Sequence, residues 1–418
     1  MQNQFDIKQN DRPEKALLIG LDTGEYDAEA SMLELEELAS TAGADVIGTM
    51  IQKRPTPDAA LYVGSGRAQE ISDFCDANDI DLIIADGELT PVQVRNLENK
   101  TDTAVIDRTA LILDIFAGRA KTSEGKLQVE LAQLQYRLPR LAGQGTSLSR
   151  LGGGIGTRGP GETKLETDKR HIRRRIAALE RQLEAVRLRR ERVHERRRKN
   201  RALSVAIVGY TNAGKSTLMN ALTNAGVLEE DKLFATLDPT ARRLTLPDGR
   251  EIMLVDTVGL VSRLPHELVD AFRSTLEEAV WADVIVNVCD ISSPECSKHM
   301  QVTADVLESL GCVGKPVINA LNKCDLAPEA TRFPLVGKSV FISAKTGQGL
   351  DELLKAVADS LPGKSARAKL LVPYLKGAVA GSVRKNAAVH SEEYTDGGIV
   401  MDVTADTRLL DEWKEYLI

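Results

Sequence analysis

The sequence has few aromatic residues, few cysteines and no long hydrophobic run. Phe, Trp and Tyr make up 4% of the 418 residues, which argues against an aromatic-rich β-sandwich. No apolar run reaches the roughly 18–20 residues that cross a bilayer, and the first 15 residues lack the apolar core of a signal peptide. The five cysteines are scattered and form no CxxC pair: Cys75, Cys289, Cys296, Cys312 and Cys324. We therefore expect neither a zinc site nor disulfides, no membrane span and a cytoplasmic location, with peripheral membrane association as an open alternative.

Positive and negative charges are distributed unevenly along the chain. The chain has 54 Lys or Arg, 61 Asp or Glu and a net charge of −7. Residues 164–201 alone hold 16 Lys or Arg and 6 Asp or Glu, so the rest of the chain carries −17. This unbalanced excess favours contact with a polyanion such as RNA, and the alternative is a solvated helix face.

The N-terminal part alternates short apolar runs with amphipathic stretches. The runs that predict buried strands are 16–20, 45–48, 61–64 and 82–85, and the stretches that predict helices are 28–42 and 67–78. This alternation predicts a small α/β subdomain with a mainly parallel sheet over residues 1–115.

A heptad period follows. Leu127, Leu131, Leu134, Leu138 and Leu141 form one apolar seam, and a second runs from Leu165 to Val193. Eight glycines lie between the seams, within residues 143–161, and so many glycines oppose a helix there. Residues 116–201 are therefore predicted to form an antiparallel helical hairpin with a glycine-rich tip.

Strand and helix signals alternate again over residues 202–362, which predicts one doubly wound domain. Its strands are expected at 204–208, 253–255, 284–288, 317–320 and 339–342. Residues 363–418 are expected to form a small α+β domain.

The first strand of this domain leads into a phosphate-binding motif of the form GxxxxGK(S/T). It consists of Gly209, Tyr210, Thr211, Asn212, Ala213, Gly214, Lys215 and Ser216, with Thr217 opening the next helix. Backbone N–H groups of such a loop surround the phosphates at a helix N-terminus. Lys215 is expected to bridge the β- and γ-phosphates, and Ser216 to bind Mg²⁺.

A DxxG motif ends a second apolar strand, at Asp256, Thr257, Val258 and Gly259. Its Asp is expected to hold Mg²⁺ through water and its Gly amide to contact the γ-phosphate.

The threonine that senses Mg²⁺ and the γ-phosphate should precede the DxxG motif in the sequence. We favour Thr236 over Thr240 and Thr245, because it lies in a loop before the next strand. That loop contains Phe234, Ala235, Thr236, Leu237 and Asp238. Lys215, Thr236 and Gly259 are the predicted catalytic residues, and Ser216, Thr236 and Asp256 the predicted metal ligands.

An NKxD motif is expected to recognise the base of the nucleotide. It consists of Asn322, Lys323, Cys324 and Asp325. Its carboxylate accepts hydrogen bonds from guanine but not from adenine, which predicts GTP and GDP as ligands. Ser343, Ala344 and Lys345 follow a further strand, where a backbone N–H would meet guanine O6. Four motifs in this order, each at a strand end, predict a GTPase of the translation-factor class.

The residue after DxxG departs from a common pattern. Many GTPases place Gln there to orient the attacking water, whereas this chain has Leu260. Because leucine has no donor or acceptor, we expect slow intrinsic hydrolysis or help from groups supplied elsewhere.

Over residues 15–362 the sequence resembles the HflX family of ribosome-associated GTPases. The resemblance rests on five segments: 107–109 with 111–120, 124–134, Gly-Pro-Gly-Glu-Thr at 159–163, 234–240, and DTVG followed by a hydrophobic residue. It implies a small α/β subdomain, a helical hairpin and a Ras-like P-loop GTPase domain. It also implies binding to the large ribosomal subunit and its RNA, and the splitting or rescue of stalled ribosomes. The residues 143–161 correspond to the family's loop that approaches the peptidyl transferase region. We expect a monomer.

Two other functions stay open. One is a GTPase that assists tRNA modification or ribosome assembly; the tRNA-modifying class is expected to carry a terminal cysteine, where this sequence has Glu415-Tyr416-Leu417-Ile418. The other is an RNA-binding scaffold with a vestigial nucleotide site, which the intact motifs argue against. Gly64-Ser65-Gly66 begins like GxGxxG, but residue 69 is Gln, so a tight turn is favoured over a second nucleotide site.

Overall fold

The computed structural model describes residues 12–141, 160–199, 202–223, 233–234, 240–261, 263, 276–329, 337–362 and 365–418. These residues form two compact units. The first contains residues 12–189 together with Leu233, Phe234 and Arg263, and the second contains the other described residues from 190 to 418. The proposed division into four domains (1–115, 116–201, 202–362 and 363–418) stays a prediction.

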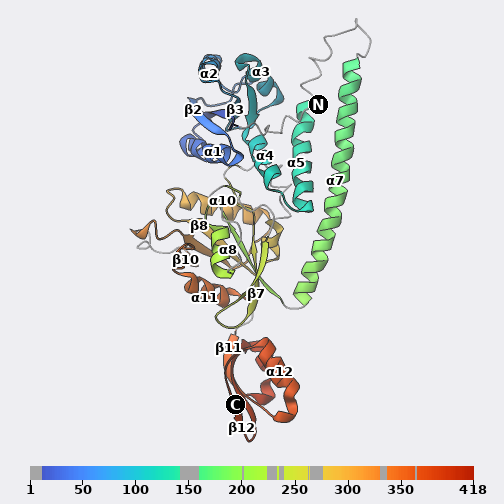
Figure 1. Ribbon diagram of the computed structural model, residues 1–418, viewed down its shortest axis with the longest axis vertical. Helices are drawn as coiled ribbons and strands as arrows, with labels where there is room; N and C mark the ends of the chain where they lie inside the picture. The colour runs from blue at the N-terminus through green and yellow to red at the C-terminus, as the bar shows by residue number, and fades with distance from the viewer. Residues whose placement is uncertain are drawn as a thin grey trace. The chain divides into compact units, whose positions relative to one another are not determined.

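The first unit is built on a four-stranded parallel sheet with the order β2-β1-β3-β4 (Figure 1). Its strands are β1 Lys15–Asp22, β2 Asp45–Lys53, β3 Leu82–Ala85 and β4 Ala104–Asp107. The helices that alternate with them are α1 Ala28–Ala42, α2 Ser65–Asn78, α3 Pro91–Thr101 and α4 Arg108–Arg119. The predicted α/β subdomain is confirmed.

Helix ends in this unit are specified by side chains. Asp27 caps α1 by accepting a hydrogen bond from Ala30 N at 3.0 Å, and Gly43 ends the helix in the left-handed region at φ 93°. Thr90 and Gln93 form a reciprocal capping box at the start of α3. These local signals explain why the predicted bounds of α1 match the structure.

One predicted strand of this region is wrong. Residues 61–64 form no ladder, because Tyr62 adopts a left-handed backbone at φ 67° and pairs only with Asp58 in an isolated bridge. Tyr62 and Val63 are nevertheless buried, so the apolar run marks the core rather than a strand. A buried run of four residues cannot distinguish the two.

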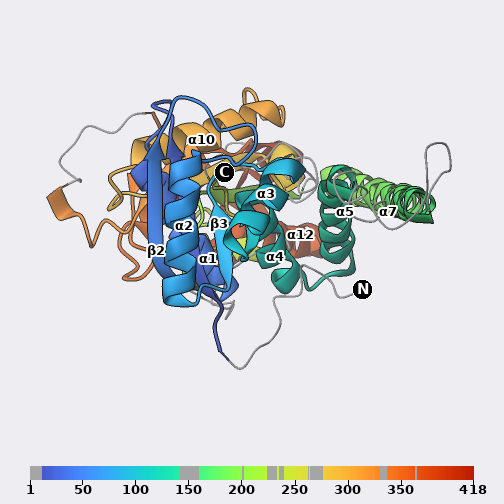
Figure 2. The same ribbon diagram turned by 90° about the horizontal axis from the view of Figure 1, so that it is seen from above.

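The predicted helical hairpin is present in α5, Ser123–Arg140, and α7, Pro160–Lys199. The two helices lie side by side in Figures 1 and 2, and Arg175 of α7 forms a two-pronged ion pair with Glu130 of α5 at 2.6 and 2.7 Å. Buried Asp107 ties α5 to the sheet by accepting from Tyr136 Oη at 2.7 Å and Arg140 Nη2 at 2.9 Å. Of the predicted glycine-rich tip, residues 143–161, the part from 143 to 159 lies outside the described residues. Pro160 and Gly161 form the first turn of α7, so the helix begins earlier than predicted.

The second unit contains a six-stranded sheet with the order β10-β9-β8-β5-β7-β6. Neighbouring strands are parallel except β6, which is antiparallel to β7. The elements are β5 Leu203–Gly209, α8 Lys215–Thr223, β6 Thr240–Thr245, β7 Glu251–Asp256, β8 Val284–Asp290, α10 Cys296–Ser309, β9 Val317–Asn322, β10 Ser339–Phe341 and α11 Leu350–Ser360. The five predicted strands of this domain are confirmed.

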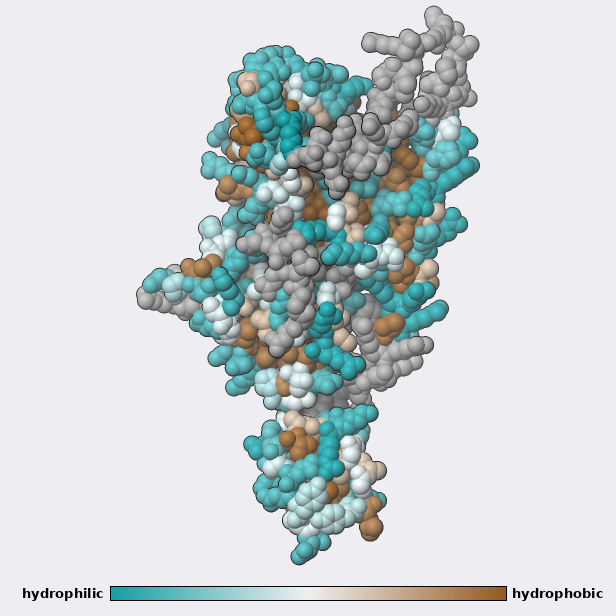
Figure 3. All heavy atoms as spheres, in the orientation of Figure 1, coloured by the Kyte–Doolittle hydropathy of each residue, from teal (hydrophilic) through white to brown (hydrophobic). Residues whose placement is uncertain are grey.

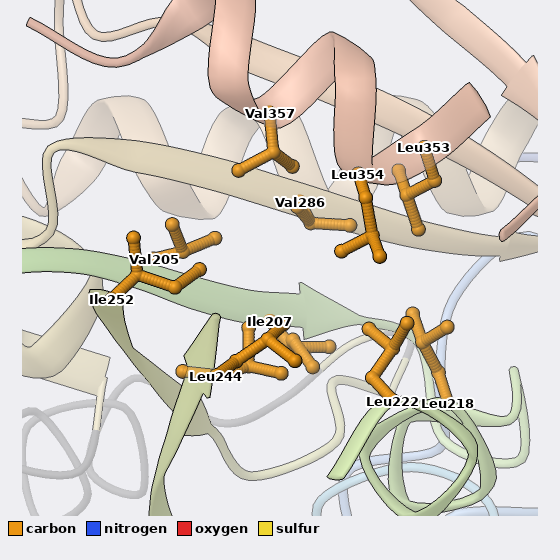
Figure 4. Close-up of a pocket in the computed structure, with 11 residues that line it drawn as sticks. Val205, Ile207, Leu218, Leu222, Leu244, Ile252, Val286, Leu353, Leu354 and Val357 are labelled. Carbon is orange, nitrogen blue, oxygen red and sulfur yellow. The ribbon is translucent and has the colours of Figure 1, made fainter. Parts of the chain in front are cut away.

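Helices α8 and α11 cover one face of this sheet. Figure 4 shows Leu218 and Leu222 of α8 facing Leu353, Leu354 and Val357 of α11 around a small cavity. Every lining side chain is aliphatic, so this cavity is a gap in the packed core and has no group that could bind a polar ligand. Nucleotide chemistry belongs instead to the carboxyl edge of the sheet.

The C-terminal residues form a three-stranded antiparallel sheet, β11-β13-β12, with helices beside it, as predicted for an α+β domain. Its elements are β11 Ser365–Val372, η4 Tyr374–Lys376, α12 Gly377–Asn386, β12 Ala388–Thr395, β13 Gly398–Asp406, α13 Thr407–Glu412 and η5 Lys414–Tyr416. Leu370, Val383, Met401 and Val403 form its core. Among the described residues, no helix is both long and apolar enough to cross a bilayer.

Candidate functional site

The phosphate-binding motif forms a tight loop between β5 and α8. Gly209 and Gly214 have φ values of 146° and 92°, which side chains rarely adopt. A Cβ at Gly209 would come to 2.2 Å from Val288 O, and one at Gly214 to 2.2 Å from Asn322 Nδ2. Both glycines are therefore required by close approach of neighbouring groups. Asn212, also left-handed at φ 57°, is exposed at the turn.

Lys215 is buried beneath this loop. Its Nζ donates to Gly209 O at 3.1 Å and Tyr210 O at 2.7 Å. Burial lowers the pKa of Lys215 to about 8, while the charge of Asp256 opposes the shift. The ammonium is thus held inside the loop, where the phosphates of a nucleotide would raise its pKa again.

The DxxG motif ends β7 and lies directly against the phosphate loop. Leu260 N donates to Gly209 O at 3.1 Å, and Thr211 N donates to Leu260 O at 2.7 Å. A Cβ at Gly259 would come to 2.7 Å from Thr211 Cγ2 and 3.0 Å from Lys215 Nζ. Only glycine fits there, and its amide lies next to the lysine that meets the phosphates.

The chemistry of the expected Mg²⁺ ligands fits the ion. Ser216 Oγ donates to Asp256 Oδ2 at 3.3 Å, so a hydroxyl from α8 and a carboxylate from β7 already meet. Asp256 has no exposed surface. Hard oxygen ligands next to phosphates are the usual protein partners of Mg²⁺. The third expected ligand, Thr236, lies outside the described residues, and Thr240 and Thr245 lie in β6.

Asn322 links three of the predicted motifs. Its Nδ2 donates to Ala213 O at 2.8 Å in the phosphate loop, and its Oδ1 accepts from Ala344 N at 2.9 Å. This amide is 3% exposed. One side chain of the NKxD loop therefore connects this loop to two others, the phosphate-binding loop and the segment 343–345.

Asp325 is presented by the loop that follows Asn322. Lys323 has a left-handed backbone at φ 62° and pairs with Asp290 at 2.7 Å. Cys324 is buried and its N donates to Ile342 O at 3.2 Å. Asp325 itself is exposed, as is Lys345, while Ser343 and Ala344 are buried. An exposed carboxylate beside a buried scaffold is suited to pairing with a base.

Some site residues lie elsewhere or were not predicted. Ala235, Thr236, Leu237 and Asp238 lie outside the described residues, whereas Phe234 is described and belongs to the first unit. Two contacts were not predicted: His299 stacks on Tyr210 with ring centroids 3.8 Å apart, and Asp290 forms an ion pair with Lys323. Neither His299 nor Asp290 belongs to a recognisable motif.

The short glycine turn of the first unit is a structural feature. Gly64 N donates to Gln52 Oε1 at 2.8 Å, so a side chain of β2 takes up the amide that would otherwise meet a ligand. A Cβ at Gly64 would also approach Gln52 and Arg54 closely. This supports the tight-turn interpretation.

The chain was compared with known protein families and solved structures. Three family models match the chain: "GTP-binding GTPase N-terminal" over residues 29–117, "GTP-binding GTPase Middle Region" over 119–198 and "50S ribosome-binding GTPase" over 204–323. A solved GTP-binding protein of Sulfolobus solfataricus in complex with GDP is 26% identical, with a TM-score of 0.43, and the match covers 83% of this chain and 98% of that one.

Several curated relatives match almost end to end. The GTPase HflX of Caldanaerobacter subterraneus subsp. tengcongensis is 48% identical over 97% of this chain and 94% of its own length. The GTPase HflX of Escherichia coli is 40% identical over 93% of both chains, and that of Akkermansia muciniphila 39% over 99% of both. This chain is a GTP hydrolase and belongs to the HflX family of ribosome-associated GTPases.

Proposed function

We propose that this protein uses the binding and hydrolysis of GTP to control its attachment to the large ribosomal subunit, and that it splits or rescues stalled ribosomes. The observation that carries the proposal is the joining of a nucleotide site to a long basic helix. Helix α7 has 40 residues, which corresponds to about 60 Å, and runs from the glycine-rich segment to within four residues of β5.

The basic helix offers charge to a polyanion. Arg173, Arg174 and Arg192 are exposed along α7, and hydrophilic residues predominate along its outer edge in Figure 3. Phosphate contacts by such side chains release counterions and supply affinity that does not depend on sequence. Ribosomal RNA presents the dense phosphate field that this surface fits.

The nucleotide bound at the GTPase site would control attachment to the ribosome. Residues 209–217 would surround the phosphates, Asp325 and residues 343–345 would hold guanine, and Ser216, Thr236 and Asp256 would hold Mg²⁺. Held by these residues, Mg²⁺ would supply positive charge against the negative charge that develops on the phosphates during hydrolysis. Lys215 would stabilise the same charge from the protein side. Leu260 cannot orient water, so we infer that the ribosome completes the hydrolytic site. We further infer a cytoplasmic monomer.

Sedimentation of ribosomes tests splitting. Wild type with GTP is expected to convert joined ribosomes into subunits, and Lys215→Ala is expected to leave them joined. Deletion of residues 152–156 shortens the glycine-rich segment without touching the nucleotide motifs. This variant should bind GTP like wild type but fail to separate subunits.

Two outcomes contradict the proposal. If the deletion variant separates subunits as well as wild type, the glycine-rich segment has no role in splitting. If wild type hydrolyses GTP on large subunits but never shifts joined ribosomes toward subunits, the splitting role is wrong, and assistance to ribosome assembly becomes the better account.

A further inference from the structure

The phosphate-binding loop carries a buried hydroxyl on Thr211. This residue is 6% exposed, and its Oγ1 has no hydrogen-bond partner in the part of the chain that the structure describes. Two nearby hydroxyls are engaged. Ser216 Oγ donates to Asp256 Oδ2 at 3.3 Å, and Thr257 Oγ1 donates to a backbone carbonyl of β5 at 2.8 Å. Because an unpaired buried hydroxyl costs free energy, the one on Thr211 calls for a functional explanation.

The Thr211 side chain lies beside the two groups that are expected to contact a γ-phosphate. A Cβ at Gly259 would come to 2.7 Å from Thr211 Cγ2 and 3.0 Å from Lys215 Nζ, so both side chains approach the same point of the DxxG motif. The lysine and the Gly259 amide are the expected γ-phosphate contacts. A γ-phosphate that they bind would therefore have Thr211 as a neighbour.

The backbone of Thr211 is also joined to the position where many GTPases have the water-orienting glutamine. Thr211 N donates to Leu260 O at 2.7 Å, and Leu260 N donates to Gly209 O at 3.1 Å. Leu260 is 5% exposed, and its side chain has neither a donor nor an acceptor. The loop thus places a hydroxyl next to the residue that replaces the glutamine.

A hydroxyl is chemically suited to orienting a water molecule. It has one donor and two acceptor lone pairs, so it can accept a hydrogen bond from the attacking water and donate one to a γ-phosphate oxygen. During hydrolysis the water oxygen bonds to the γ-phosphorus while the bond from phosphorus to the bridging oxygen breaks. The electron pair of that bond stays on GDP, and the released phosphate takes the water proton. The hydroxyl itself neither gains nor loses a proton overall.

We propose that the Thr211 hydroxyl is a catalytic group, which orients the attacking water in place of the glutamine that Leu260 replaces. It would act in the intrinsic reaction, to which the ribosome adds further groups. The proposal rests on the GTPase activity of this chain and not on ribosome binding or splitting. A test without ribosomes can therefore refute it and leave the proposed ribosomal function standing.

The test measures single-turnover GTP hydrolysis by the full-length protein without ribosomes. Thr211→Val removes the hydroxyl at nearly constant volume and should lower the rate constant by on the order of 100-fold. GDP should bind like wild type. GDP with aluminium fluoride, which mimics the transferred phosphoryl group, should bind more weakly by a similar factor. Thr211→Ser retains the hydroxyl and should keep most of the turnover.

Thr223→Val is the matched control, because it removes a hydroxyl from the last residue of α8, where Oγ1 donates to Met219 O at 2.7 Å. This variant should hydrolyse GTP like wild type. Thermal unfolding separates catalysis from folding. Without a nucleotide, Thr211→Val should be at least as stable as wild type, because it removes a hydroxyl that has no partner among the described residues.

Three results would each overturn the proposal. The first is a wild-type rate constant in Thr211→Val. The second is GDP binding that weakens in this variant as much as turnover does, since the hydroxyl would then act in binding alone. The third is a Thr211→Ser variant as slow as Thr211→Val, because the methyl group would then be the part that matters.

Discussion

At the residue scale, Lys215 combines burial with a functional charge. Its pKa of about 8, compared with an ordinary 10.5, follows mainly from desolvation inside the phosphate loop. A depressed lysine pKa means that the unfolded chain holds this proton more tightly. This group therefore makes the free energy of unfolding of the nucleotide-free protein rise with pH between about 8 and 10.5.

The same shift predicts proton uptake when a nucleotide binds. Phosphates next to Nζ favour the charged lysine and raise its pKa, so GDP binding at pH 9 should take up most of one proton and much less at pH 7.5. Calorimetry at each pH, in two buffers with different heats of ionisation, measures the number of protons taken up per GDP bound. Binding heats at pH 9 that do not depend on the buffer would show that Lys215 keeps its charge in the free protein.

Asp325 is the residue on which base choice is predicted to depend. Asp325→Asn should weaken GDP binding by roughly 10- to 100-fold, because a charge-assisted pair is lost, and should strengthen binding of xanthosine diphosphate, whose hydrogen-bonding edge is inverted. Titration calorimetry with both nucleotides checks this, with Leu326→Ala as the control at the neighbouring exposed position. Equal affinity of the variant and wild type for GDP would refute the assignment.

At the scale of secondary-structure elements, the apolar period of the sequence predicted the two helices of the hairpin, but it did not predict how far along α7 the seam residues are buried. Leu131 and Leu179 lie in the predicted seams and are buried, but Val193 of the second seam is 41% exposed. Glu130 faces Arg175, so Ser123 at the start of α5 faces about residue 182 of its antiparallel partner. Beyond that point α7 has no α5 to cover it. Periodicity predicts a helix face but not the length of its partner.

Strand prediction succeeded where a run was both apolar and bounded by turn signals, as in β1, β3 and β5. It failed at Tyr62, whose burial resembles that of a strand but whose backbone is left-handed. The motif residues were placed at strand ends because their spacing is tied to backbone–phosphate geometry. Their roles in nucleotide binding stay predictions, and the bracing of three loops by Asn322 was visible only in three dimensions.

At the scale of the whole molecule, the least predictable feature is that Phe234 and Arg263 belong to the first unit. Each lies within a sequence that reads as part of the GTPase domain: Phe234 begins the predicted nucleotide-binding loop, and Arg263 follows the DxxG motif. Their contacts with Phe116 and Asp86 join residues more than 100 positions apart, which no local pattern encodes. Sequence patterns predict local backbone geometry and the apolar faces of helices and strands. They do not predict which residues far apart in the sequence come into contact.

We propose that one protein couples GTP hydrolysis to ribosome binding through a basic helix. GTP turnover measured with and without large ribosomal subunits, over a range of salt concentrations, tests this coupling. Wild type should be stimulated by the subunits. Replacing Arg173, Arg174 and Arg192 with Gln should reduce that stimulation and lower the salt slope by about one unit per lost phosphate contact, with intrinsic turnover unchanged.

The control variant replaces exposed Lys376, Lys385 and Lys414 with Gln and changes the net charge equally. It should keep the stimulation and salt slope of wild type. Turnover that large subunits do not raise in wild type, or a control that loses as much stimulation as the α7 variant, would contradict the account.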